Sequence, residues 1–300
     1  MPRVALVGPT ASGKSAVALE VARRLGDVDL VSIDSMQVYR GMDIGTAKPT
    51  PDERAEVPHH LIDLVEPIHD FTVAEFTAAY AVAIGSIDER RRRALLVGGT
   101  GLYHRVVIDD FDLPGEWPEV RAELDAVADT ASLHERLSLL DPDAASKMEP
   151  SNRRRVVRAL EVTLGSGRPF SSYGPGVDHY PSSPVQQIGL RWPRRVIADR
   201  IERRVHQMMS DGLVAEVEAL VDGVGFSRSA SQALGYKEIL DVLAGRIGQD
   251  EATDLVITRT RRFAVRQERW FRRDPRVRWI DVEHDPVAEV APIVIDAFDT

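Results

Sequence analysis

The stretch VGPTASGKS, residues 7–15, decides the fold of this chain. It follows RVALVG, an apolar run typical of a buried parallel strand, and leads into SAVALEVARRLG, whose apolar residues recur at helical spacing. Within it, Gly8, Gly13, Lys14 and Ser15 match the pattern G-x-x-x-x-G-K-[ST]. Strand, loop and helix stand in the order that a phosphate-binding loop requires, so a glycine-rich turn without this role is the weaker alternative.

The residues of this loop have the chemistry that polyphosphate binding needs. Glycines let the backbone curl so that successive N–H groups point inward, and the following helix adds the positive end of its dipole. Lys14 supplies a charge for the outer phosphate, and Ser15 supplies a hydroxyl for Mg²⁺. ATP, GTP or any other diphosphate-bearing molecule satisfies the same donors. The predicted contacts are Gly8, Pro9, Thr10, Ala11, Ser12, Gly13, Lys14 and Ser15.

Strands and helices alternate along the first third of the chain. VDLVSID and RALLVGG are typical of further strands, and a helix-compatible segment, residues 73–92, lies between them. This alternation predicts an α/β fold with a doubly wound parallel sheet. LPGEWP, residues 113–118, interrupts the pattern, and only helices are predicted over residues 119–165. A loop rich in proline, glycine and serine, residues 168–184, then leads back to VQQIGLRW, a predicted strand that rejoins the sheet. We expect a core of residues 1–114 and 185–300, with helices in its C-terminal part, and an all-helical insertion at 115–184.

Composition limits the class of protein. The chain has 300 residues, of which 43% are hydrophobic and 28% charged, a balance typical of soluble globular proteins, and the lack of cysteine fits a reducing cytoplasm. No apolar run approaches the ~20 residues that span a bilayer, so no membrane partner is expected. The absence of cysteine excludes disulfides, thiolate metal sites and a cysteine nucleophile. His59 and His60 are adjacent without a third ligand nearby, which favours a structural role over a metal site.

Basic residues are unevenly distributed. The net charge is −9, yet all but four of the 38 basic residues are arginines, and many occur in runs. In a predicted helix at 253–273, five arginines recur every three or four residues and so share one face. An RNA backbone fits this stripe, whereas a solvated face paired with acidic groups is the alternative. The five are Arg259, Arg262, Arg266, Arg269 and Arg273, while Gln267 and Trp270 fall on a face suited to packing.

An acidic residue follows the second predicted strand. Asp34 falls at the carboxyl edge of the sheet, where ligands of α/β proteins bind. A carboxylate beside a phosphate site serves as a metal ligand or as a general base, and a strand-end cap is the structural alternative. Small kinases with a phosphate loop also have an acid here. A GTPase is disfavoured because no NKxD-type guanine motif is present.

Seven segments occur in the order found in bacterial tRNA dimethylallyltransferases, which the chain resembles from residue 4 to about residue 274. They are GPTASGKS, DSMQVYRGMDIGTAKP, HHLIDLVEP, VGGTGLY, NRRRVVRALEV, ALGYKEI and TRRFAVRQERWFRR. The resemblance implies a phosphate-loop α/β core with a helical insertion. It also implies transfer of a dimethylallyl group from dimethylallyl diphosphate to N6 of adenosine 37, in tRNAs that read codons beginning with U.

The same resemblance implies roles for particular residues. Asp34 takes the proton from the adenine amino group, and Thr10 contacts the diphosphate near its bridging oxygen. Lys14, Ser15 and Arg204 hold the diphosphate with Mg²⁺, and Thr10 and Lys14 complete the catalytic set. The residues expected at the tRNA anticodon stem-loop include two from the arginine stripe, Arg262 and Arg266. The full set is Asp34, Ser35, Met36, Gln37, Thr100, Arg121, Arg155, Arg262 and Arg266.

Two other enzymes fit part of this pattern. A small-molecule kinase would use ATP in the loop, Asp34 as base and some arginines as a lid, but the stripe exceeds what a lid needs. An adenylate isopentenyltransferase would prenylate free AMP and would not need an insertion that faces tRNA. A non-catalytic RNA-binding module leaves the phosphate loop unexplained.

We expect the protein to act as a monomer.

Overall fold

The computed structural model describes residues 2–111, 113–174 and 176–299. These form two compact units, one of Met1–Asp109 with Ser182–Thr300 and one of Asp110–Pro181. The sequence predicted the insertion at 115–184, so both of its predicted bounds lie a few residues after those of the second unit. In these ranges, none of the helices combines the length and apolar character that crossing a membrane requires.

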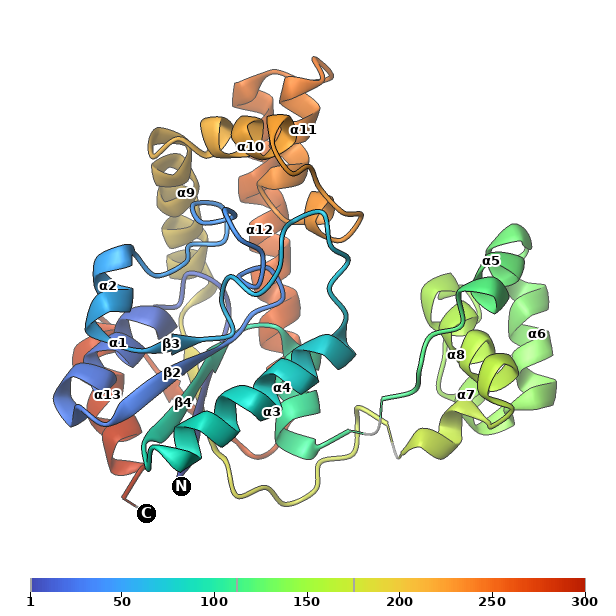
Figure 1. Cartoon of the computed structure of the whole chain (residues 1–300), viewed down its shortest axis with the longest axis horizontal. Coiled ribbons are helices and arrows are strands. Elements are labelled where there is room, and N and C mark those ends of the chain that lie inside the picture. Colours follow the sequence, from blue (N-terminus) through green and yellow to red (C-terminus); the bar gives the residue numbers. More distant parts are fainter. Residues whose placement is uncertain (1, 112, 175, 300) are drawn as a thin grey trace. The chain divides into compact units, whose positions relative to one another are not determined.

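The first unit is built on a six-stranded sheet in which every pairing is parallel, with the order β3-β2-β4-β1-β5-β6 (Figure 1). The predicted doubly wound α/β core is confirmed. The strands are β1 Arg3–Val7, β2 Val28–Ile33, β3 His59–His60, β4 Arg93–Gly98, β5 Gln186–Arg191 and β6 Val277–Asp281. Four of them correspond to predicted strands, whereas β3 and β6 were not predicted.

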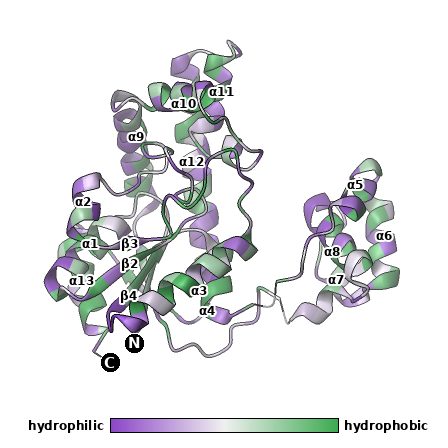
Figure 2. Cartoon of the chain, in the orientation of Figure 1, coloured by the Kyte–Doolittle hydropathy of each residue, from purple (hydrophilic) through white to green (hydrophobic). Residues whose placement is uncertain are grey.

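Helices cover both faces of this sheet. One apolar layer joins the strands to α1, α9, α12 and α13, and the other joins them to α3, α4, α10 and α11. Hydrophobic residues are concentrated on the strands, whereas much of α9 is hydrophilic (Figure 2). The helices are α1 Lys14–Leu25, α2 Pro51–Glu56, α3 Val73–Glu89, α4 Gly101–Asp109, α9 Arg194–Ser210, α10 Leu213–Asp222, α11 Tyr236–Leu243, α12 Gln249–Phe271 and α13 Pro286–Asp296.

The second unit is helical in its described part and has its own apolar core, which includes Leu124, Leu137, Val157 and Leu160. Side chains that accept hydrogen bonds from backbone N–H groups begin three of its helices: Asp129, Asp141 and Asn152. Its elements are α5 Pro118–Ala126, α6 Thr130–Leu140, α7 Pro142–Ser146, α8 Arg153–Ser166 and the 3₁₀ helix Phe170–Tyr173. This agrees with the helical insertion that the sequence predicts.

Candidate active site

The phosphate loop connects β1 to α1, and two of its glycines lie so close to neighbouring segments that a side chain would not fit. Gly8 has a backbone φ of 143° and Gly13 a φ of 98°, values that residues with a side chain rarely adopt. A Cβ on Gly8 would lie 3.0 Å from the Leu190 carbonyl oxygen in the neighbouring strand β5. A Cβ on Gly13 would lie 2.7 Å from the Pro286 ring. The loop is therefore packed against the sheet and α13, with its shape set before any ligand arrives.

Three side chains from distant parts of the sequence bind the loop backbone. Trp192 Nε1 donates to the Ser12 carbonyl at 2.9 Å, and Arg200 Nε donates to the Ala11 carbonyl at 2.7 Å. The Thr10 N–H donates to the Gln267 side-chain oxygen at 2.8 Å. Sequence reasoning missed all three as site residues, because each lies at least 180 residues beyond the loop position it contacts.

Two cations face the inside of the site. Lys14 Nζ donates to the Gly8 and Pro9 carbonyls at 2.9 and 2.7 Å. Burial, followed by the charge of Arg204, lowers the pKa of Lys14 to about 7, and Asp34 opposes this shift. Arg204 is half-buried, forms no hydrogen bond or ion pair with the described residues, and has a pKa lowered by burial. The two positive charges are therefore largely uncompensated, and a bound anion would neutralise them.

Asp34 lies beside these cations with one oxygen held and one available. Oδ1 accepts the Met36 N–H at 2.8 Å and the Gln37 N–H at 3.4 Å, while Oδ2 bonds to none of the described residues. The carboxylate is half-buried. Its charge acts on both Lys14 and Arg204. The arrangement fits a general base whose orientation is fixed through its other oxygen.

The remaining residues expected beside the adenine, here called the acceptor side, differ in whether their side chains are already hydrogen-bonded within the protein. Thr100 Oγ1 accepts the Ser35 N–H at 3.2 Å, so the turn after β4 lies against the turn that carries Asp34. Gln37 accepts from Ser32 Oγ at 2.7 Å and donates to two backbone carbonyls, so its amide is occupied within the protein. Met36 packs against the second apolar layer. Ser35 and Thr100 thus line this side while Gln37 supports it.

Ser15 is the predicted metal ligand. Its hydroxyl is exposed at the start of α1 and makes no hydrogen bond with the described residues. No group of three His, Cys, Asp or Glu side chains suited to a metal occurs in the described part of the chain. A Mg²⁺ that takes most of its ligands from a diphosphate and water, and one from Ser15, fits this donor set.

The arginine stripe on α12 is shorter than the spacing predicts. Arg259 forms an ion pair with Glu238, whose side chain is buried, so this arginine is part of the packing between α11 and α12. Arg262, Arg266 and Arg269 are exposed and pair with no acidic side chain among the described residues. The expectation of one continuous five-residue surface is therefore wrong at Arg259, because helical spacing assigns a face and says nothing about partners on neighbouring helices.

The two predicted tRNA contacts of the second unit also differ. Arg121 pairs with Asp125 at 2.9 Å and with Glu161 at 3.5 Å. Arg155 is exposed near the start of α8, and its side chain has no acidic partner among the described residues. Arg155 is thus available to a phosphate, whereas Arg121 would have to exchange its carboxylates.

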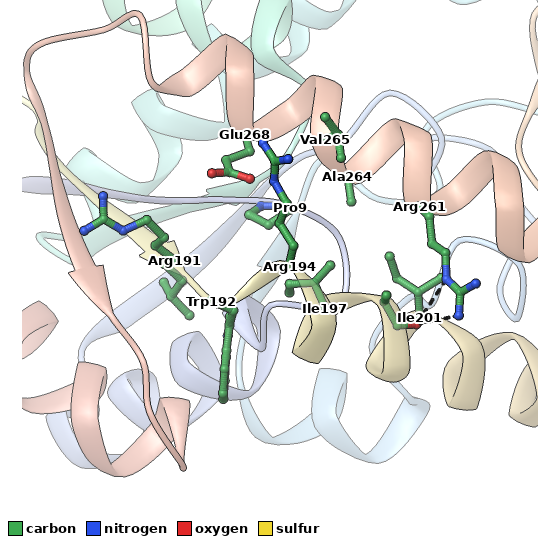
Figure 3. A pocket seen from close by; sticks show the side chains of 12 residues that line it. Pro9, Arg191, Trp192, Arg194, Ile197, Ile201, Arg261, Ala264, Val265 and Glu268 are labelled. Atoms are coloured by element: carbon green, nitrogen blue, oxygen red, sulfur yellow. Dashed lines mark hydrogen bonds between the residues drawn. The ribbon is translucent and has the colours of Figure 1, made fainter.

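A pocket of about 140 Å³ lies between α9 and α12, beside Pro9 of the loop (Figure 3). Its apolar wall includes Leu190, Ile197 and Ile201. Strand β5, which leads into it, and strand β2, which leads to Asp34, lie on opposite sides of β1. The pocket is therefore on the other side of the loop from the candidate base.

The adjacent histidines have the structural contacts that the sequence favours. His60 Nε2 lies 2.8 Å from the buried Asp29 carboxylate, which also pairs with Arg90 and Arg92. His59 Nδ1 lies 2.7 Å from the Val57 carbonyl, and burial lowers its pKa. Both histidines thus stabilise the edge of the sheet.

A doubly wound sheet with an anion-binding loop and a carboxylate beside it defines a class of enzymes that transfer groups to or from phosphate-bearing substrates. The sequence profile described as IPP transferase matches residues 37–274. The chain therefore belongs to the IPP transferase family, whose members are transferases.

Individual relatives agree with this assignment. A tRNA dimethylallyltransferase of Salinispora tropica is 48% identical over 282 residues, which cover 93% of this chain and 88% of that protein. One from Moorella thermoacetica is 44% identical over 307 residues, with 98% and 94% covered.

Solved structures are similar over the full length. The tRNA isopentenylpyrophosphate transferase of Bacillus halodurans has a TM-score of 0.71 and 41% identity, covering 99% of this chain and 97% of that one. The tRNA delta(2)-isopentenylpyrophosphate transferase of Staphylococcus epidermidis has a TM-score of 0.72 and 33% identity, covering 100% and 99%. The fold and the family thus agree over both units.

Proposed function

We propose that this chain transfers a dimethylallyl group from dimethylallyl diphosphate to N6 of adenosine 37, in tRNAs that read codons beginning with U. The products are N6-isopentenyladenosine and diphosphate. One observation carries the proposal: among the described residues, Lys14 and Arg204 form no ion pair, and the charge that acts on both is that of Asp34, whose second oxygen is available. The similar proteins from Salinispora tropica and Moorella thermoacetica are tRNA dimethylallyltransferases, and the one from Bacillus halodurans is a tRNA isopentenylpyrophosphate transferase, which supports this reaction rather than the kinase or the free-AMP alternative.

The proposed chemical step is a substitution at carbon. The adenine N6 nitrogen attacks C1 of the dimethylallyl group, and the bond from C1 to the bridging oxygen breaks. The electron pair of that bond leaves with the diphosphate, and Asp34 Oδ2 accepts the proton that N6 loses. The negative charge that develops on the leaving group is stabilised by Lys14, Arg204 and the N–H groups of the loop.

Ser15 would help to hold a Mg²⁺ ion at this site, and that ion would neutralise charge on the leaving diphosphate. Thr10, at the middle of the loop, contacts the diphosphate near its bridging oxygen. The donors of the loop also fit the phosphates of ATP, which we propose as a second ligand of the same site. The enzyme acts as a monomer in the cytoplasm, where its tRNA substrate is found.

The anticodon stem-loop is the proposed acceptor. The adenine must leave its stack to reach Asp34, at a cost of a few kcal/mol that protein contacts offset. Ser35, Met36 and Thr100 contact the acceptor beside the site, and the backbone of Gln37 completes this turn. Arg262 and Arg266 on α12, with Arg121 and Arg155 in the second unit, bind backbone phosphates.

A transfer assay tests this function. The full chain, Mg²⁺ and radiolabelled dimethylallyl diphosphate are incubated with unmodified tRNA that has A36-A37-A38, with the same tRNA carrying G37, and with AMP. We expect label only in the A37 tRNA. Label in AMP, or no label with ATP-dependent phosphorylation of a small molecule, would contradict the proposal.

A further inference from the structure

Gln267 lies on the buried face of α12 and uses both ends of its side-chain amide. The Thr10 N–H donates to Oε1 at 2.8 Å, and Nε2 donates to the Gly99 carbonyl at 3.0 Å. The residue is only 7% exposed, so water competes weakly for these two bonds. One side chain thereby joins the phosphate loop to the turn that follows β4.

That turn is shaped to receive α12. A Cβ on Gly99 would lie 2.2 Å from Gln267 Nε2, and a Cβ on Gly101 would lie 2.2 Å from the Trp270 ring. The glycines of VGGTG therefore allow a close approach of the helix that any side chain would prevent. The contact between Gln267 and this turn is built into the packing of two segments far apart in the sequence.

The turn after β4 also contacts the acceptor side of the site. Thr100, the residue after Gly99, accepts the Ser35 N–H at 3.2 Å, and its own N–H donates to the Ile33 carbonyl at 3.4 Å. Asp34 lies between these two partners in the chain. Gln267 is thus the middle member of a series of contacts that begins at Thr10 and ends beside the candidate base.

We propose that Gln267 is a positioning residue for the transfer reaction. It holds Thr10, on the side of the prenyl donor, at a fixed distance from the turn beside Asp34, on the side of the adenine. The inference rests on the proposed function. Substitution at C1 requires the attacking nitrogen, the carbon and the leaving oxygen to be aligned, and a displacement of about 1 Å costs on the order of 100-fold in rate.

The same helix carries the proposed tRNA contacts on its other face. Arg266 is exposed and precedes Gln267 directly, and Arg262 lies about one turn earlier. A tRNA bound to this face therefore contacts the rigid element that positions the phosphate loop. Loss of the Gln267 amide should leave tRNA affinity intact while it disturbs the alignment of the two substrates.

Two variants of the full chain separate the roles of the amide. Gln267→Met has a similar volume and removes both hydrogen bonds. We expect kcat to fall about 10- to 100-fold with an unchanged Kd for A37 tRNA. Gln267→Glu keeps the acceptor for Thr10 but places an oxygen opposite the Gly99 carbonyl. Its activity relative to wild type should rise as the pH falls, because a protonated carboxyl donates to that carbonyl.

Val256→Ala is the matched control, since Val256 is buried in the apolar layer on the same helix and touches neither bond. It should lower the unfolding temperature and keep the wild-type kcat at temperatures well below it. A Gln267→Met enzyme with wild-type kcat, or a Gln267→Glu enzyme whose relative activity ignores pH, would overturn the positioning role. Failure of the wild-type chain to label A37 tRNA would instead overturn the proposed function.

Discussion

Two groups of cations in this molecule differ in their surroundings. Lys14 and Arg204 lie half-buried beside Asp34, whereas Arg262, Arg266 and Arg269 are exposed on α12. Charges in a partly buried site interact strongly over short distances, while exposed charges are screened by salt. The first group suits a small, highly charged leaving group at a fixed position. The second suits a long polyanion whose position along the helix is less strictly defined.

The strongest test of this contrast removes the carboxylate beside Lys14 and Arg204, the inner group of cations; the exposed arginines of α12 are the outer group. Asp34→Asn keeps the size of the side chain but cannot accept the proton from N6. We expect kcat to fall by a factor of about 10² to 10⁴, the usual contribution of a general base. Binding of A37 tRNA, measured by filter retention, should not weaken, because the substitution removes a negative charge from the surface that faces RNA. A variant with near-normal turnover would exclude the base role.

Removal of the inner cation should have the next largest effect. Lys14→Met deletes the charge in a half-buried site, and we expect a loss of about 10² to 10³ in kcat/KM for the donor. Arg262→Met deletes an exposed charge of the outer group and is the matched comparison. It should leave kcat/KM for the donor nearly unchanged at saturating tRNA. Equal losses in the two variants would show that the groups share one role.

The local sequence predicts Lys14 and Asp34 at the inner site, whereas Arg204 is implied there only by the family resemblance, for a physical reason. The phosphate loop is contiguous, so its strand, glycines, Lys14 and helix can be recognised together, and Asp34 follows from the end of a strand. The partners of a side chain on another element leave no such local pattern. Spacing therefore placed Arg259 on the stripe, while its pairing with Glu238 depends on how α11 packs. Gln267 was assigned to packing for the same reason.

Element prediction failed under similar conditions. β3 comprises only His59–His60, too short for a periodic pattern to appear. β6, Val277–Asp281, mixes charged and apolar residues because it lies at the edge of the sheet. Strands at the centre, such as β1 and β4, are apolar nearly throughout and were predicted from that property alone.

Charge reversal in the outer group sharpens the comparison through salt dependence. With Arg262→Glu and Arg266→Glu combined, we expect weaker tRNA binding and a slope of log K against log salt that is about two units less steep. Arg23→Glu with Arg24→Glu is the control, since both residues lie at the end of α1 remote from the phosphate loop. An unchanged slope in the first double variant would place the RNA contacts on another surface.

The smallest expected effect concerns pH and separates the groups by titration. Burial and Arg204 lower the pKa of Lys14 to about 7, so in the empty protein this lysine loses its proton as the pH rises through 7. Donor binding requires the charged form. The Kd for dimethylallyl diphosphate should therefore increase up to about tenfold per pH unit above 7, whereas exposed arginines keep tRNA affinity constant.

Lys14→Arg provides the control, because a guanidinium stays charged throughout this range and experiences the same ionisation of the donor. Its donor affinity should not fall between pH 7 and 9. The sign for stability is opposite to that for binding. The unfolded chain binds this proton more tightly, so the unfavourable contribution of Lys14 is full below pH 7 and disappears toward pH 10.5. Calorimetry of the empty protein should thus show wild type gaining stability relative to Lys14→Arg as the pH rises, and a constant difference would mean that Lys14 titrates normally.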